Sequence, residues 1–315
     1  MNRRANDRPE TPEAPGTVPA ASAAPTGGEA TRPMYWSVRR ELWESRSIYV
    51  APLAVAGLFL FGFLVSLIQL PGKMRAALAL DAMARHESIV QPYELAALAL
   101  MATTFLVAVL FCLDALHGER RDRSILFWKS LPVSDRTTVL AKAAIAIVVI
   151  PLLTFVITVA TQWVMLLSGS LVLAGSGLSV TTLWAQVSLF AMSLDLLYHL
   201  LAIHGLWYAP IFAWLLLVSA WARRAPFLWA FLPPLAICIL EKLAFDTTHF
   251  AALLGQRISG GGEAVLSSAR GMAMGPMTED PPGTFLLSPG LWIGLAFAGV
   301  CLAGAARLRH RREPN

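Results

Sequence analysis

Residues Ala143–Leu167 read AAIAIVVIPLLTFVITVATQWVMLL, a continuous apolar run without a single charged side chain. About 20 helical residues are enough to cross the hydrocarbon core of a bilayer, which is roughly 30 Å thick. We therefore predict that this stretch is a transmembrane helix. Pro151 lies inside it and lacks the N–H that an α-helix needs, so we expect a kink at this position.

The composition of the whole chain agrees with this prediction. Of its 315 residues, 56% are hydrophobic and only 14% are charged, whereas a soluble domain has roughly a quarter charged. The net charge of +5 could suggest nucleic-acid binding. The Lys and Arg residues lie mostly beside apolar runs, however, and the positive-inside rule explains that placement better. We predict an all-α polytopic membrane protein without a nucleic-acid partner.

Six transmembrane helices are predicted, at about residues 48–70, 93–115, 143–167, 203–222, 227–245 and 290–308. Ser134 is expected to cap the helix that carries the third span, which would start near Asp135 and run for about 30 residues. Pro233 and Pro234 are expected to break the fifth span. Residues 183–222 allow two interpretations, namely two crossings or a helix near the outer surface over 183–201 followed by one crossing. We favour the second interpretation.

The segments outside the spans complete the predicted organisation. Residues 1–33 are rich in Pro, Ala, Thr and Gly and are expected to form a disordered cytoplasmic tail ahead of a membrane domain over 34–312. Residues Met34–Ser47, MYWSVRRELWESRS, are predicted to form an amphipathic interfacial helix. Residues 246–289 are assigned to a large outer loop. The distribution of Lys and Arg places both termini in the cytoplasm of a multi-pass protein.

A charged and aromatic segment, HGERRDRSILFWKSLPVSD, occupies His117–Asp135 between the second and third spans. Ile125, Trp128 and Leu131 share one helical face, and Pro132 ends the helix. Two interpretations are open from these residues alone. The segment is either an ordinary positive-inside loop with an aromatic anchor at the interface, or a short helix that docks in a groove of a soluble partner.

Two stretches resemble a known family: CLDALHGERRDRSILFWKSLPVSDRTTVLAK (Cys112–Lys142) and LWYAPIFAWLLLVSAWARRAPFLWAFLPPLA (Leu206–Ala236). Together with the amphipathic helix before the first span, they resemble the permease subunit of type 2 ABC exporters over most of residues 34–312. The resemblance implies that the loop after the second span is a coupling helix, that the permease dimerises, and that cytosolic ATPase subunits bind it. It assigns the ATPase contact to Glu119, Arg120, Arg121, Asp122, Arg123, Phe127 and Trp128.

The chain has no GxxxxGK[ST] motif, the loop that cradles nucleotide phosphates. We therefore expect no enzymatic activity and no cofactor in this chain, with ATP and Mg bound by the partner ATPase. The resemblance further implies alternating access in the bacterial inner (plasma) membrane, among membrane lipids. Its substrate path, walled by the second and fifth spans, is rich in Ala, Leu, Phe and Thr. That lining favours an amphipathic or lipid-like cargo, including peptide antibiotics.

An alternative function rests on Asp195, His199 and His204, which are ionisable groups in an apolar region. They could form a metal-dependent or acid/base site of a membrane-embedded enzyme, or a polar cluster at an outer gate. The five-residue spacing of the histidines and the lack of an HExxH motif argue against metal, so no metal site is predicted. A secondary transporter ranks lower still, because neither inverted repeats nor midplane charges are evident.

Two sets of sulfur-containing residues are candidates for metal or disulfide sites. Met272, Met274 and Met277 have a spacing that could hold Cu(I), but no His or Cys lies nearby, and a loop that packs apolar residues on the outer gate explains them better. The three cysteines lie singly inside apolar runs. They indicate neither a disulfide framework nor a zinc site and are expected to be small buried hydrophobes.

Overall fold

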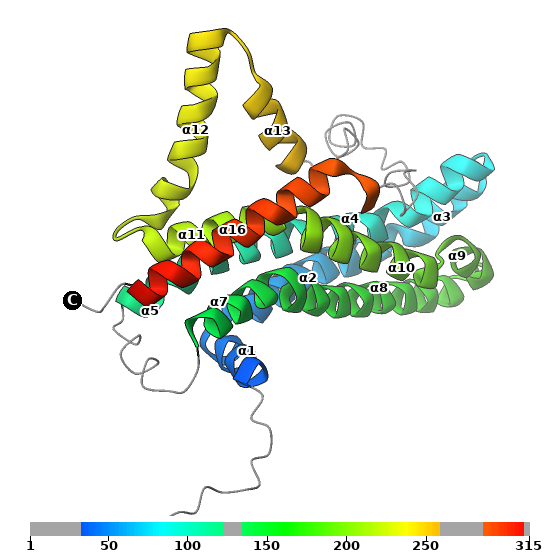
Figure 1. The fold of residues 1–315 in the computed structure, drawn as a ribbon. Coiled ribbons are helices and arrows are strands. Elements are labelled where there is room, and N and C mark those ends of the chain that lie inside the picture. The colour runs from blue at the N-terminus through cyan, green and yellow to red at the C-terminus, as the bar shows by residue number, and fades with distance from the viewer. Residues whose placement is uncertain (1–32, 122–133, 259–285, 312–315) are drawn as a thin grey trace, which may run out of the picture. The chain divides into compact units, whose positions relative to one another are not determined.

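The computed structural model describes residues 33–121, 134–258 and 286–311 (Figure 1). Several predictions therefore fall outside the described residues and stay predictions. They concern the tail before residue 33, most of the 246–289 loop with Met272, Met274 and Met277, and the ATPase-contact residues Asp122, Arg123, Phe127 and Trp128.

Every described secondary-structure element is a helix, and six helical stretches are long and apolar enough to cross a membrane. The predicted class, an all-α polytopic membrane protein, is confirmed. The first half of the chain forms α1 (Pro33–Glu44), α2 (Ser47–Ser66), the 3₁₀ turn η1 (Leu67–Gln69), α3 (Leu70–Leu78), α4 (Ala82–Ala115), α5 (His117–Arg121), α7 (Asp135–Ala144), the π-helical turn η2 (Ile145–Val149) and α8 (Ile150–Gly175). The second half forms α9 (Val180–Gln186), α10 (Leu189–His199), the π-helical segment η3 (Leu200–Trp207), α11 (Ala209–Trp221), α12 (Pro226–Phe245), α13 (His249–Ile258) and α16 (Pro289–Arg311).

The helix of the third span begins as predicted and runs further than predicted. The Ser134 side chain accepts a hydrogen bond from the Thr137 N–H at 3.1 Å, which confirms the cap. The helical run then continues for 41 residues to Gly175. Directly before Pro151 its backbone winds as the π-helical turn η2. Pro151 has no N–H to offer the Ile147 carbonyl four residues earlier, so the α-helical pattern is interrupted at this point.

The fourth span differs from its prediction over about 203–222, because the structure's fourth candidate span covers Val180–Trp207 and Ala209–Trp221 is a shorter apolar helix. Helix α10 continues into η3, and α11 follows after Tyr208, so helical structure runs almost without interruption from Leu189 to Trp221. Within α10 the His199 ring bonds the Asp195 carbonyl oxygen one turn earlier at 3.0 Å.

The expected break at Pro233 and Pro234 is also wrong, because α12 runs through both prolines from Pro226 to Phe245. The fixed φ of proline is compatible with a helix, and membrane helices tolerate the lost backbone hydrogen bonds. Of the side chains in α12, only Ala230 is buried. Nearly all of this apolar helix is therefore free to face lipid or another protein.

Polar pairs reinforce the packing between α4 and α8. The hydroxyls of Thr104 and Thr154 lie 2.6 Å apart, and the Gln162 amide donates to the Tyr93 carbonyl at 3.3 Å. Hydrophobic burial adds little between helices that are already in lipid, so close packing and hydrogen bonds of this kind stabilise the pair. Elsewhere α11 packs most extensively against α16, and Figure 1 shows the two running side by side.

Candidate functional site

The short helix α5 is the described start of the segment 117–135, and α11 holds it in place. The Ser219 hydroxyl, wholly buried on α11, accepts hydrogen bonds from the N–H groups of Leu116 and His117, each at 3.0 Å. These two amides lie at the junction between α4 and α5. Ser219 therefore fixes the direction in which the chain leaves the second span.

Arg120 makes the reciprocal contact from α5 to the end of α11. Its guanidinium donates to the carbonyl of Ser219 and, at 2.9 Å, to the carbonyl of Ala222. The last carbonyls of a helix have no partner within the helix, and a cation beside them also stabilises the negative end of the helix dipole. Arg120 thus caps α11, while Ser219 of α11 anchors α5.

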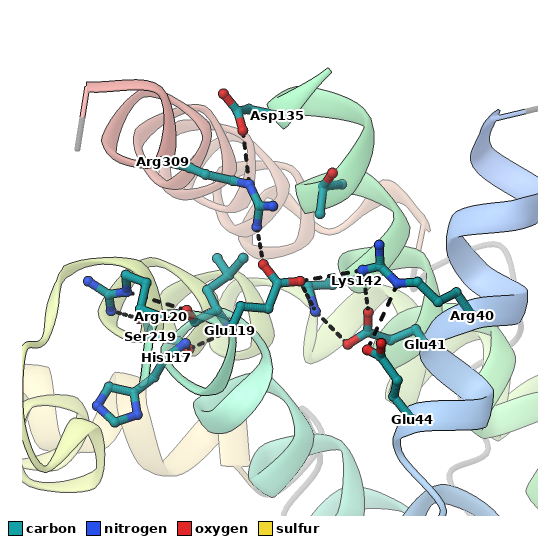
Figure 2. Close-up of polar contacts among 12 residues, drawn as sticks. Arg40, Glu41, Glu44, His117, Glu119, Arg120, Asp135, Lys142, Ser219 and Arg309 are labelled. Atoms are coloured by element: carbon teal, nitrogen blue, oxygen red, sulfur yellow. Dashed lines mark hydrogen bonds and ion pairs between the residues drawn. The ribbon is translucent and has the colours of Figure 1, made fainter. Parts of the chain in front are cut away.

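Glu119 is the centre of a charged cluster made of Arg40, Glu41, Glu119, Asp135, Lys142 and Arg309 (Figure 2). Its Oε1 lies 3.1 Å from Nζ of Lys142 and 3.5 Å from Nη2 of Arg40. Its other oxygen, Oε2, accepts from the Arg309 guanidinium. One carboxylate thereby joins α5 to α1, α7 and α16.

The remaining contacts close the charged cluster. Lys142 also pairs with Glu41, and Nε of Arg309 donates to Oδ1 of Asp135 at 2.9 Å. Glu41, Glu119, Lys142 and Arg309 are 5%, 8%, 1% and 7% exposed, so two carboxylates and two cations are buried together and their charges balance. Buried ions persist only when they are paired and hydrogen-bonded in this way.

Glu44 lies at the edge of the charged cluster, where Nε of Arg40 approaches its Oε2 at 3.9 Å. Partial burial raises the pKa of Glu44 above its usual value, and the Arg40 charge opposes that shift. Its side chain is about half exposed. Glu44 is therefore a peripheral member that contributes little, unlike the buried carboxylates.

This arrangement suits mechanical linkage better than acid/base chemistry. Both buried carboxylates are engaged by cations, so neither is available as a general base. The elements that they join are the amphipathic helix α1 and the ends of the second, third and sixth spans. A displacement of α5 would be transmitted to all of them through charge-assisted hydrogen bonds.

The structure divides the predicted ATPase-contact residues. Glu119 is buried and Arg120 is partly buried, and both bond to groups of their own chain. Arg121 is exposed at the end of α5. Asp122, Arg123, Phe127 and Trp128 follow outside the described residues. Glu119 and Arg120 accordingly hold the base of the segment in place.

The second predicted group separates into two parts. Asp195 Oδ1 lies 3.5 Å from His199 Nδ1, and the Asp195 side chain is 56% exposed. His204 is buried against the rings of Phe105, Tyr208 and Phe212 instead. Over the described parts of the chain, no three His, Cys, Asp or Glu side chains are arranged to hold a metal ion. All three cysteines are free, and Cys112 and Cys301 are buried.

Sequence reasoning missed several members of the charged cluster, among them Glu41, Lys142 and Arg309. Two of them carried a readable signal. Glu41 lies on the same face of α1 as the apolar residues Val38 and Leu42, where an acid is unexpected. Lys142 directly precedes the uncharged run that starts at Ala143. An ionisable residue on an apolar face or at the start of a span predicts a buried partner, but the sequence does not say which one.

Comparison with known proteins gives no match to a protein-family model, to a curated protein or to a solved structure. The function therefore has to be inferred from the geometry of the chain itself.

Proposed function

We propose that this chain is the membrane-spanning permease subunit of an ATP-driven exporter of the type 2 ABC class. In this proposal residues 117–135 dock on a separate cytosolic ATPase, which binds ATP and Mg. The observation that supports it is the attachment of α5. Through Glu119 this five-residue helix is joined to α1, α7 and α16, and through Ser219 and Arg120 it is joined to α11.

An ordinary connecting loop needs no such attachment. A segment that receives force from a partner does need it, because a loosely held helix would move without moving the spans. The charged cluster supplies this stiffness, since each of its buried carboxylates is held by at least two cations. In the proposed division of labour, Glu119 and Arg120 anchor the segment. Arg121, Asp122, Arg123, Phe127 and Trp128 meet the ATPase.

The proposed orientation in the membrane rests on where helices α1 and α16 lie. Helix α1 and helix α16 both contact α7, so the first and last described helices meet at the same end of the chain's fold. Exposed cations gather in the segments that end there, including Arg39, Arg46, Arg136, Arg223 and Arg311. By the positive-inside rule these cations support a cytoplasmic location for this end. The proposal takes the membrane to be a bacterial inner membrane.

The transport step in this proposal is alternating access at a permease dimer. The apolar and largely exposed surface of α12 supports a path bordered by this helix and a second copy. A path with such walls suits an amphipathic or lipid-like cargo, including peptide antibiotics. Closure of the ATPases would move α5, and the charged cluster would pass that movement to the spans.

Site-specific photo-crosslinking in the native membrane tests the proposal. A photoreactive amino acid replaces Trp128 in one variant and, as a matched control, Trp184 of α9 in another. Trp184 is 44% exposed and lies on α9, which connects the end of α8 to the start of α10. These helix ends lie away from the charged cluster. We expect Trp128 to capture a P-loop ATPase and Trp184 to capture none. The proposal is wrong if neither position captures an ATPase, or if both do so equally.

A further inference from the structure

A groove with a volume of about 510 Å³ lies where α1, the first turn of α2 and the η2–α8 junction meet. It lies outside the charged cluster, and none of its lining residues belongs to that cluster. Its lining consists of Leu42, Trp43, Arg46, Tyr49, Val149 and Leu153.

The lining has one cationic group, two amphipathic rings and an apolar wall. Leu42, Val149 and Leu153 form the apolar part. Arg46 is exposed, and no ion pair of the described residues involves it. Trp43 and Tyr49 have the amphipathic rings that gather at the level of the lipid headgroups. A ligand that fits this groove has an apolar body and a negatively charged end.

The surface of α1 beside the groove is also positive. A stripe on α1 consists of Trp36, Arg39 and Trp43, which follow each other at spacings of three and four residues. The Arg39 guanidinium lies 5.4 Å from the ring centroid of Trp36 and 5.7 Å from that of Trp43. Arg46 continues this stripe three residues later and keeps helical backbone angles. The acids of α1 are engaged elsewhere, because Glu41 pairs with Lys142 and Glu44 approaches Arg40. The stripe therefore presents cations without a compensating carboxylate.

We propose that this groove binds an anionic phospholipid of the leaflet at the charged end of the protein. The phosphate lies at Arg46 between the rings of Trp43 and Tyr49, and an acyl chain lies along Leu42, Val149 and Leu153. Basic pockets beside membrane helices recognise anionic headgroups by this combination of charge and apolar surface. The bound lipid touches α1, α2 and α8 at once and braces the interfacial helix against the spans. This site is independent of the proposed exporter activity.

The test uses the full-length protein in mild detergent and a phosphatidylglycerol that carries a photoreactive group in its acyl chain. Phosphatidylcholine with the same chains is the zwitterionic comparison, and inorganic phosphate is the competitor that lacks chains. Adducts are located by peptide mapping. The variants are Arg46→Gln and Leu153→Trp, which fills the groove without changing its charge. Arg224→Gln is the control, because Arg224 is an exposed cation near the end of α11 that lies outside the groove.

We expect phosphatidylglycerol adducts on the peptides that contain residues 42–49 and 149–153. Because one cation near the membrane surface changes the affinity for an anionic lipid by about fivefold, Arg46→Gln should lower the yield by about that factor. Leu153→Trp should lower it as well, and Arg224→Gln should not. The proposal is overturned if phosphatidylcholine labels these peptides equally or if Arg46→Gln has no effect. The proposal is also overturned if inorganic phosphate, which has no acyl chains, displaces the phosphatidylglycerol, because the groove would then be a site for free phosphate.

Discussion

The ammonium group of Lys142 lies 3.1 Å from Oε1 of Glu119, and both side chains are almost wholly buried. This contact joins the end of the second span to the start of the third across a segment of more than twenty residues. A third element, α16, reaches the same carboxylate through Arg309. The two residues therefore fix the geometry of the end of the fold from which the segment 117–135 departs.

Glu119→Gln is expected to be strongly destabilising. It removes the charge that two buried cations share and leaves the charged cluster with one excess positive charge. Breaking a buried ion pair costs about 3–5 kcal/mol because charge is left uncompensated. The free energy of unfolding in mixed micelles, measured by denaturing-detergent titration, checks this. Glu44→Gln is the matched control, since its side chain is half exposed, and it should change stability by about 0.5 kcal/mol or less.

The double variant Glu119→Gln/Arg309→Gln extends this test. Removing both partners restores the balance of positive and negative charge in the cluster, which Glu119→Gln alone upsets, although Asp135 loses its contact with Arg309. The double variant should therefore be less destabilised than the sum of the two single variants. Strict additivity would show that Glu119 and Arg309 do not interact in the folded protein.

Ser219→Ala is expected to loosen α5. The change leaves two buried N–H groups, those of Leu116 and His117, without their acceptor, which costs about 1–3 kcal/mol. Unfolding titration measures the cost, and hydrogen exchange of the two amides should accelerate. Ser168→Ala is the control, because that side chain is only half-buried and its hydroxyl bonds to carbonyls of its own helix. Equal effects of the two variants would contradict the assigned role of Ser219.

Gly205→Ala tests the contact between the two π-helical segments. A Cβ at this position would lie 3.2 Å from the Ile147 carbonyl oxygen, so the backbone of η2 has to move. Crowding of this kind costs about 1–3 kcal/mol. At Gly62 of α2 no atom lies within 4 Å of such a Cβ. Gly62→Ala should therefore leave stability unchanged or raise it by up to about 1 kcal/mol, because Ala is the better helix former.

Gly294→Ala is expected to detach α13 from α16. The new Cβ would occupy the place of the Arg257 guanidinium, which donates to the Trp207 and Gly290 carbonyls and lies 4.1 Å from the centroid of the Trp207 ring. Limited proteolysis within α13 should become faster in this variant. Gly299→Ala on the same helix has open space around its Cβ and should be cleaved like the wild type. Unchanged proteolysis of Gly294→Ala would show that Arg257 does not hold α13.

The sequence alone determined the class and most of the candidate spans, the fourth excepted. Apolar runs such as 143–167 are long enough to cross a bilayer whatever they pack against, and the charged flanks of these runs are equally local features. The cap at Ser134 was predictable for the same reason, since a cap depends on residues within one turn. The outcome at Pro233 and Pro234 was not, because a membrane helix can tolerate what an isolated helix would not.

Only the tertiary structure decided which polar groups meet. From the sequence, Glu119 was expected to be an exposed contact for a partner, but it is buried in the structure. Its burial depends on Arg40, Lys142 and Arg309, which lie at distant places in the sequence. Asp195, His199 and His204 read as one cluster, and the turn of the helix places His204 among aromatic rings instead. Local sequence decides whether a segment enters the membrane. Pairing of charges depends on where helices come together, and that is a property of the whole fold.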